Sequence, residues 1–94
     1  MLSRIPIDLT KMDPEDLDRE ILRAAIIAEL DAINLYEQLA AMATDENIRA
    51  VLLDVAREEK THVGEFQTLL LDLDEEQAEE LEHGAEEVDE LTTE

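Results

Sequence analysis

The chain has 94 residues and a mass of 10.7 kDa, enough for one small domain with a single core. It carries 27 acidic and 7 basic residues, a formal net charge of −20, which argues against nucleic acids and anionic membranes as partners. Its lack of cysteine excludes disulfides, thiolate metal sites and iron–sulfur clusters within these residues. Because 45% of the residues are hydrophobic, we expect a folded domain rather than a disordered acidic tail.

Targeting and membrane segments are not evident in the sequence. The longest uninterrupted apolar run is Ala24–Ala28, whereas a membrane-spanning helix needs about 20 such residues. The first residues lack the cationic start and the apolar block of a signal peptide. We therefore expect a cytosolic protein that binds neither nucleic acid nor membrane.

The chain is predicted to be all-α, because only two glycines and two prolines interrupt it and strand-like alternation is missing. Three helices are expected, over about residues 14–42, 45–71 and 75–90. Asp13 is a suitable N-cap for the first helix, and Pro14 suits its first position. We treat residues 1–94 as a single domain.

The later helix boundaries rest on weaker signals. Thr44 is the expected N-cap of the second helix. Asp74 and Gln77 resemble a capping box for the third helix, and His83–Gly84 is a place where that helix is expected to end or break. Residues 1–12 and the last few residues are expected to be loosely attached.

The two long helices each carry an apolar seam with alternating spacings of three and four residues. In the first helix the seam is Leu22, Ile26, Glu29, Ile33, Tyr36 and Ala40. In the second helix it is Ile48, Leu52, Val55, Glu59, His62, Phe66 and Leu69. Such seams on two helices joined by a short turn predict an antiparallel hairpin.

A second apolar row runs along the first helix. It consists of Ile21, Ala25, Ala28, Ala32, Leu35 and Leu39. An isolated hairpin cannot bury both rows, so the third helix or another copy of the chain has to cover the second one. Of these two, an oligomer is the favoured interpretation.

Three polar residues interrupt the seams: Glu29 in the first helix, and Glu59 and His62 in the second. Burial of an unpaired carboxylate costs several kcal/mol, so two of them in a seam indicate a cationic partner. With the turn near residues 44–45 and a rise of about 1.5 Å per residue, all three lie roughly 22–24 Å from the turn. Because residues three apart share a helix face, the three side chains should meet at one point.

One glutamate from one helix and a Glu-x-x-His pair from its neighbour make half of a ferritin-like di-iron site, which takes two of each from four helices. Two chains related by a twofold axis would complete both the site and a four-helix bundle. Oxygen and imidazole ligands suit iron or manganese, and zinc less specifically. The sequence therefore predicts a dimer with iron held by Glu29, Glu59 and His62.

A polar network without metal is the alternative for these residues. The cationic residues in range are Arg23, Arg57 and Lys60, none of which falls on the two seams. Tyr36, two turns from Glu29, is either a hydrogen-bond donor behind the ligands or a core residue.

A second Glu-x-x-His match occurs at Glu80 and His83. Both residues fall off the apolar stripe of the third helix, which is made by Ala78, Leu81, Ala85 and Val88. We interpret this second match as a solvated surface pair.

The stretch from Glu20 to Leu71 resembles the encapsulated ferritins, the ferritin-like cargo proteins of encapsulin nanocompartments. The resemblance rests on Ala28–Tyr36, on Ala56–His62 and on the 30-residue spacing between Glu29 and Glu59. It is greatest to the archaeal members, which can be fused ahead of the shell protein.

The resemblance implies a ferroxidase that holds two irons across a dimer interface, with the product mineralised inside the shell. It also implies further assembly into open rings, commonly decamers. Some members carry acidic residues at the positions of Ala28 and Asp31 and an aromatic at Leu35, which form a secondary metal site. Here only Asp31 is acidic. Since Val88–Glu94 shows no shell-targeting tail, a chain fused ahead of a shell protein is one interpretation.

Two other functions stay open at this point. Rubrerythrin-type peroxide reduction usually relies on a four-cysteine iron site, which this chain lacks. A non-enzymatic module that binds metal or mediates oligomerisation is the third possibility. The acidity has two explanations, a halophilic surface or attraction of Fe(II) toward the site.

Overall fold

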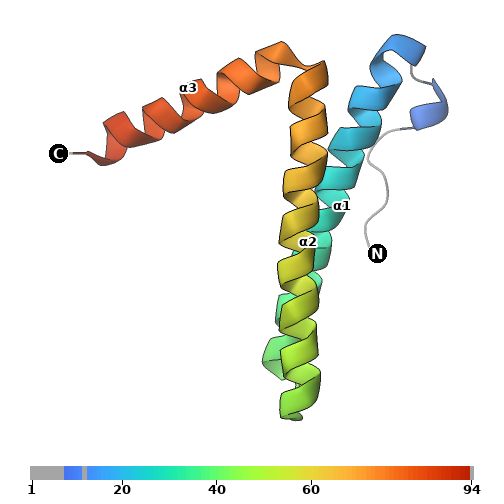
Figure 1. Ribbon diagram of the computed structural model, residues 1–94, viewed down its shortest axis with the longest axis vertical. Helices are drawn as coiled ribbons and strands as arrows, with labels where there is room; N and C mark the ends of the chain where they lie inside the picture. The colour runs from blue at the N-terminus through green and yellow to red at the C-terminus, as the bar shows by residue number, and fades with distance from the viewer. Residues whose placement is uncertain (1–7, 12, 94) are drawn as a thin grey trace.

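A computed structural model describes residues 8–11 and 13–93, and within these residues all regular secondary structure is helical. Its elements are a short 3-10 helix η1 (Leu9–Lys11) and the helices α1 (Pro14–Met42), α2 (Glu46–Leu73) and α3 (Glu75–Thr92). Figure 1 shows α1 and α2 side by side as a hairpin, while α3 runs away from its end. The all-α prediction is confirmed, and each predicted helix range is within two residues of the observed one.

The N-terminal ends of the first two helices differ from prediction in their caps. Asp45, not Thr44, caps α2: its Oδ1 accepts hydrogen bonds from the N–H groups of Asn47 (2.8 Å) and Ile48 (3.0 Å). A carboxylate at this position satisfies two otherwise unpaired N–H groups. Asp13 occupies the N-cap position of α1 with an extended backbone, but its side chain makes no capping hydrogen bond.

The third helix is longer than predicted. Asp74 caps it as expected, accepting a hydrogen bond from the N–H of Gln77 at 3.0 Å. The helix does not stop at His83–Gly84 but continues to Thr92. Gly84 has no positive φ, and a glycine ends a helix when it takes the left-handed conformation. Inside a helix its cost relative to alanine is only about 1 kcal/mol.

Within residues 1–12, Leu9–Lys11 form the helix η1, and the loose attachment expected for this segment stays a prediction. Asp8 precedes this turn and accepts hydrogen bonds at Oδ1 from the N–H and the hydroxyl of Thr10. These hydrogen bonds lower the pKa of the Asp8 carboxyl. Residues 1–7, 12 and 94 lie outside the described part of the chain.

The turn between α1 and α2 is fastened by Arg49. Its guanidinium donates hydrogen bonds to the carbonyl oxygens of Ala40 (3.2 Å) and Ala43 (2.5 Å) at the end of α1. It also pairs with Glu46 at 3.0 Å. The last carbonyl groups of a helix have no partner in the helix itself and attract positive charge, so this arginine closes α1 while holding the start of α2.

Arg49→Ala is expected to lower the free energy of unfolding of the metal-free protein by about 1–2 kcal/mol, because two carbonyl groups lose a charged donor. Urea unfolding followed by circular dichroism measures the change. The matched control is Arg57→Ala, which breaks an exposed pair with Asp54 inside α2 and should leave the free energy of unfolding close to that of the parent. Equal losses in the two variants would contradict this role for Arg49.

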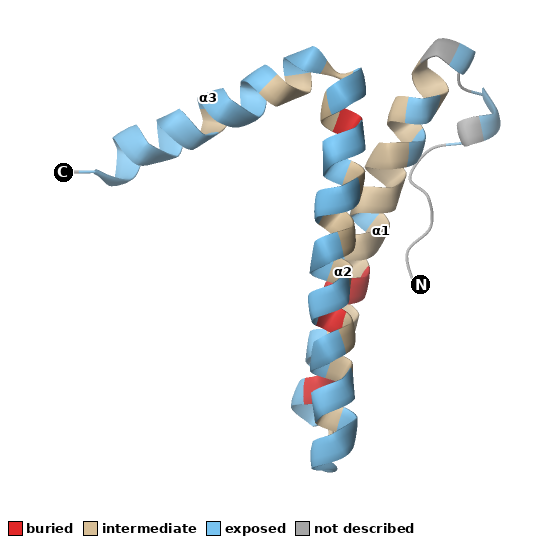
Figure 2. Ribbon diagram, in the orientation of Figure 1, coloured by how far each residue is buried: buried red, intermediate tan, exposed pale blue. Residues whose placement is uncertain are grey.

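Few side chains of the single chain are buried (Figure 2). The buried residues are Ala32, Ile33, Ala40, Ala56 and Leu70. Larger apolar side chains remain open to solvent, among them Met42 (77% exposed) and Val51 (62% exposed). Because α3 points away from the hairpin, it does not cover the second apolar row of α1 (Figure 1). The oligomer that was expected to cover this row stays a prediction.

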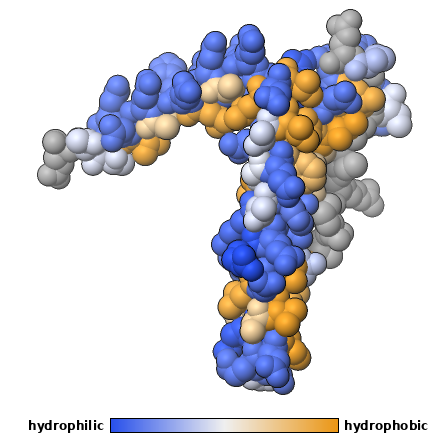
Figure 3. Space-filling model, viewed as in Figure 1, coloured by the Kyte–Doolittle hydropathy of each residue, from blue (hydrophilic) through white to orange (hydrophobic). Residues whose placement is uncertain are grey.

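The hydrophobic surface of the hairpin is visible in Figure 3 as orange patches beside hydrophilic surface. Among the described residues, no helix combines the length and the hydropathy that crossing a bilayer requires.

Candidate metal centre

The structure brings together the three polar residues of the seams. Glu29 is on α1, and Glu59 and His62 are one turn apart on α2. The Nδ1 atom of His62 lies 3.4 Å from Oε2 of Glu59 and 3.6 Å from Oε2 of Glu29. One ligand atom from each residue falls within 4.8 Å of the others. The predicted convergence of these three side chains is therefore confirmed as geometry.

The local sequence explains this meeting. The i, i+3 spacing of Glu59 and His62 puts both on one face of α2. The short connection between Met42 and Glu46 fixes the register of the antiparallel helices, so Glu29 comes to the level of that pair.

The carboxylates lie deeper than the imidazole. Side-chain exposure is 18% for Glu29, 19% for Glu59 and 43% for His62. Among the described residues, Oε2 of Glu29 is buried without a hydrogen-bond partner. Native structures seldom leave such a group unsatisfied, because the lost hydration is not replaced.

A divalent metal ion fits this donor set. Two carboxylates and one imidazole are ligands that iron, manganese and zinc accept. Oε2 of Glu29, which has no hydrogen-bond partner among the described residues, lies beside the other two donors, where a bound cation would contact it. These residues therefore fit the metal that the seam pattern predicts.

The basic side chains near the cluster are engaged elsewhere. Arg23 pairs with Glu20 and Asp74, at 2.9 Å and 2.8 Å. Lys60 pairs with Glu37 at 3.0 Å, and Arg57 pairs with Asp54. In the part of the chain that the structure describes, no lysine or arginine forms an ion pair with either carboxylate of the cluster. A metal-free network of these residues would therefore have to rely on His62, which is charged only when protonated.

The second Glu-x-x-His match is a surface feature. His83 lies 3.6 Å from Glu80 and 3.8 Å from Glu87, all on α3. The three side chains are between 61% and 64% exposed, and no second helix contributes a donor in the described structure. This agrees with the prediction of a solvated pair.

His83→Ala should accordingly leave the rate of Fe(II) oxidation within about twofold of the parent, because this imidazole contacts only exposed carboxylates of its own helix. Oxygen uptake after addition of Fe(II) measures the rate. A loss as large as that of a Glu29 variant would place part of the reactive site on α3.

Tyr36 and Asp31 do not join the cluster. Both are half-buried on α1, and the group of converging ligand atoms does not include Asp31. Among the described residues, the Tyr36 hydroxyl makes no hydrogen bond to Glu29, Glu59 or His62. Two roles therefore stay predictions: that of Tyr36 as a hydrogen-bond donor to the ligands, and that of Asp31 in a secondary metal site.

Two ion pairs that hold α1 were not predicted: Glu37 with Lys60 on α2, and Arg23 with Asp74 just after the end of α2. A signal for them exists in the sequence. Arg23 and Glu37 are 14 residues apart on α1, and Lys60 and Asp74 are also 14 residues apart. Opposite charges two heptads apart on each helix fit one antiparallel register, in which both pairs form.

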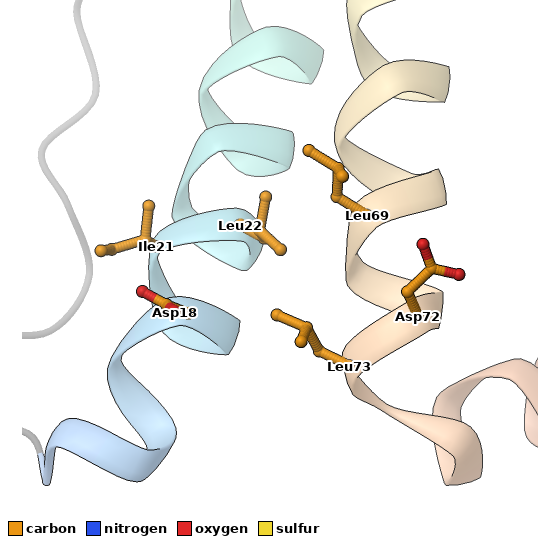
Figure 4. Close-up of a pocket in the computed structure, with 6 residues that line it drawn as sticks. All are labelled: Asp18, Ile21, Leu22, Leu69, Asp72 and Leu73. Atoms are coloured by element: carbon orange, nitrogen blue, oxygen red, sulfur yellow. The ribbon is translucent and has the colours of Figure 1, made fainter.

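A groove lies at the open end of the hairpin (Figure 4). It has a volume of about 410 Å³ and is lined by Asp18, Ile21, Leu22, Leu69, Asp72 and Leu73. None of the three clustered donors lines it, so it is separate from the candidate metal centre.

Comparison with known proteins places this hairpin and its cluster in a family. The protein-family model described as Rubrerythrin matches residues 20–93. The crystal structure of the encapsulated ferritin domain from Pyrococcus furiosus superposes with a TM-score of 0.84 and 60% sequence identity, over 98% of this chain and 94% of that one. The chain belongs to the encapsulated ferritin family.

Two curated relatives agree with this assignment. The ferritin-like-encapsulin shell fusion protein of Pyrococcus furiosus is 73% identical over 73 residues, which are 78% of this chain and 21% of the relative. The encapsulin nanocompartment cargo protein EncC of Myxococcus xanthus is 44% identical over 68 residues, or 72% of this chain and 52% of that protein. This encapsulated ferritin chain thus spans about a fifth of one relative and half of the other.

Proposed function

We propose that the chain oxidises Fe(II) to Fe(III) with oxygen, at a di-iron site that two copies of the chain build together. The observation that carries this proposal is the convergence of Glu29, Glu59 and His62, with Oε2 of Glu29 buried and without a hydrogen-bond partner among the described residues. Membership of the encapsulated ferritins supports iron as the metal.

The dimeric site follows from the number of donors and from their exposure. Each chain supplies one glutamate and one Glu-x-x-His pair, half of the set that ferritin-like di-iron centres use. His62 is 43% exposed in the single chain. Val51, 11 residues before it, and Leu69, seven after it, lie on the same side of α2 and are 62% and 54% exposed. A partner packed on this side would cover all three residues and bring its own donors.

In the proposed mechanism each residue has a defined part. Glu29 and Glu59 supply negative charge that favours Fe(III) over Fe(II), and His62 supplies a neutral nitrogen donor. Bound iron supplies the electrons that reduce oxygen. The packing of α1 against α2 limits the access of water to the two carboxylates, because these are less than one-fifth exposed even in the single chain. Manganese or zinc could occupy the same donors in place of iron.

A shell protein is the proposed partner outside the dimer. One relative is described as a fusion with an encapsulin shell and the other as encapsulin cargo. We infer that this chain works inside an encapsulin nanocompartment in the cytoplasm, where the shell, fused or separate, stores the oxidised iron. Assembly of the dimers into a ring-shaped decamer is part of the same proposal.

Peroxide reduction is the second candidate, favoured by the family model described as Rubrerythrin. It would use the same three donors with a different oxidant. A non-enzymatic metal-binding module is the remaining alternative.

Oxygen uptake by the metal-free protein after anaerobic loading with Fe(II) tests the proposal. We expect oxygen consumption well above that of Fe(II) in buffer, and the yield of Fe(III) should follow the amount of protein. Faster turnover with hydrogen peroxide than with oxygen would instead support the rubrerythrin-type reaction. Iron binding without accelerated oxidation by either oxidant would overturn the enzymatic proposal.

A further inference from the structure

The two ends of the hairpin are held in different ways. At the turn, Arg49 ties the end of α1 to the start of α2. At the other end the helices are not joined by the chain, and the groove of Figure 4 lies between them. Leu69 and Leu73, which line this groove from α2, are 54% and 53% exposed. Apolar packing therefore fastens this end only in part.

An ion pair bridges the helices beside this open end. The guanidinium of Arg23 on α1 donates to Oδ2 of Asp74 at 2.8 Å, and also holds Glu20 of its own helix at 2.9 Å. Asp74 is 11% exposed at its side chain, whereas Arg23 is 42% exposed. The acceptor thus lies in a sheltered position where a charged hydrogen bond is screened less by solvent.

The same carboxylate organises the corner between α2 and α3. Asp74 is the single residue between the two helices, with φ −136° and ψ 87°. Its Oδ1 accepts the hydrogen bond from the N–H of Gln77 in the first turn of α3. One oxygen therefore caps α3 and the other is held by α1.

Other contacts that could set the direction of α3 are missing from the described residues. In that part of the chain α3 packs only against the end of α2, and it runs clear of α1 (Figure 1). The helix carries nine acidic residues and no lysine or arginine over Glu75–Thr92. In a chain with a net charge of −20, α3 is repelled by the hairpin rather than drawn to it.

We infer that the Arg23–Asp74 ion pair acts as a charge latch with two effects. It sets the direction of α3, and it holds α1 against α2 at the open end of the hairpin. When the pair is formed, α1 holds the N-cap of α3 in place. When the pair is broken, the corner is free to pivot at Asp74, and α1 is released from α2 at the groove. The apolar side chains of α3, Leu81 and Val88, change their position relative to the hairpin when the latch opens. This inference is independent of the metal centre.

The surroundings of the latch make it sensitive to salt. The hydrogen bond from the Gln77 N–H lowers the pKa of the Asp74 carboxyl most, against the opposing effect of burial, and the positive charges of Arg23 and then of Arg19 lower it further. Arg23 holds Glu20 through one guanidinium nitrogen and Asp74 through the other. At about 1 M salt the screening length is only about 3 Å, short enough to weaken a pair with a half-exposed arginine.

Distance measurements between spin labels test the latch, and the absence of cysteine in the chain lets labels be placed freely. Asn34 on α1 and Glu90 on α3 are exposed and serve as label sites. Labelled full-length chains are diluted with unlabelled ones to suppress distances between copies. We expect a narrow distribution at low salt, and a distribution broader by about twofold or more in Arg23→Gln, which breaks the pair but keeps the cap. Hydrogen exchange in residues 17–24 should rise in the same variant.

Three further samples complete the design. Asp74→Asn keeps a capping side chain and loses the charge, so it should behave like Arg23→Gln. Asp45→Asn changes the cap at the other end of α2 and should leave the distribution narrow. High salt should broaden the distribution of the parent but add less to that of Arg23→Gln, although it screens helix repulsion in both. A narrow distribution in Arg23→Gln, whatever the result for Asp74→Asn, would overturn the latch.

Discussion

Replacement of Glu29, Glu59 or His62 by alanine should abolish most Fe(II)-dependent oxygen consumption while leaving the metal-free protein as stable as the parent, or more stable. The loss of activity is expected to be at least about tenfold to a hundredfold, since even substitution of residues that only hydrogen-bond to metal ligands lowers activity or metal affinity by that factor. Stability should not fall in the two glutamate variants, because clustered carboxylates repel each other when no cation is present. In His62→Ala it should change little, because His62 is the most exposed of the three side chains. Removal of Glu29 also removes its unpartnered buried oxygen.

Loss of oxygen consumption together with unchanged or increased stability of the metal-free protein distinguishes a metal centre from a structural polar network. If the three residues instead supported one another without metal, each truncation would leave a buried partner unpaired and cost about 3–5 kcal/mol. Thermal unfolding is measured in chelator and then with Fe(II), alongside oxygen uptake. Asp54→Ala is the matched control, since it removes an exposed carboxylate from α2 near Glu59 and should change neither quantity appreciably.

Variants that unfold well below the parent in chelator, and that still oxidise iron in the folded fraction, would contradict the di-iron site. Gain of thermal stability on adding Fe(II) should be large in the parent and small in the three variants, because a ligand stabilises only the state that binds it.

The sequence was sufficient for the hairpin and for the meeting of the three donors, and the reason is geometric. Helix periodicity fixes which residues share a face, and a short turn fixes which levels of two helices meet. The proximity of Glu29, Glu59 and His62 depends only on these two factors, so it is predictable without a structure.

Features that depend on a single contact or on competition between caps were not predictable in the same way. Asp45 and Thr44 are both good N-caps, and only the observed hydrogen bonds select Asp45. The continuation of α3 through Gly84 shows that a glycine without a positive φ is a modest cost rather than a stop. The direction of α3 relies on Arg23 and Asp74, which are 51 residues apart in the chain, and the 14-residue spacings that match them become meaningful only once the register of the hairpin is known.

Assembly gives the second large expected effect. Sedimentation should show a dimer or a larger even-numbered species, promoted by Fe(II), because each chain holds half of the donors and leaves large apolar side chains exposed. Salt is also expected to promote it, since each copy carries a net charge of −20. A well-folded monomer that binds iron and oxidises it at the full rate would contradict the interface site.

A pair of matched variants locates the interface. Val51→Glu places a charge 11 residues, or about three turns, before His62 on the same side of α2, where the partner is expected to pack. Val51 is 62% exposed in the single chain, so the substitution should leave the helix intact while it prevents the dimer and lowers oxygen consumption by at least about tenfold. Leu53→Glu is the control: Leu53 is 48% exposed but lies nine residues, about two and a half turns, from His62 and therefore on the opposite side. Dimer and activity should survive in Leu53→Glu. If Val51→Glu also keeps both, the copies do not meet on the His62 side of the hairpin, and each chain must complete its metal centre in another way.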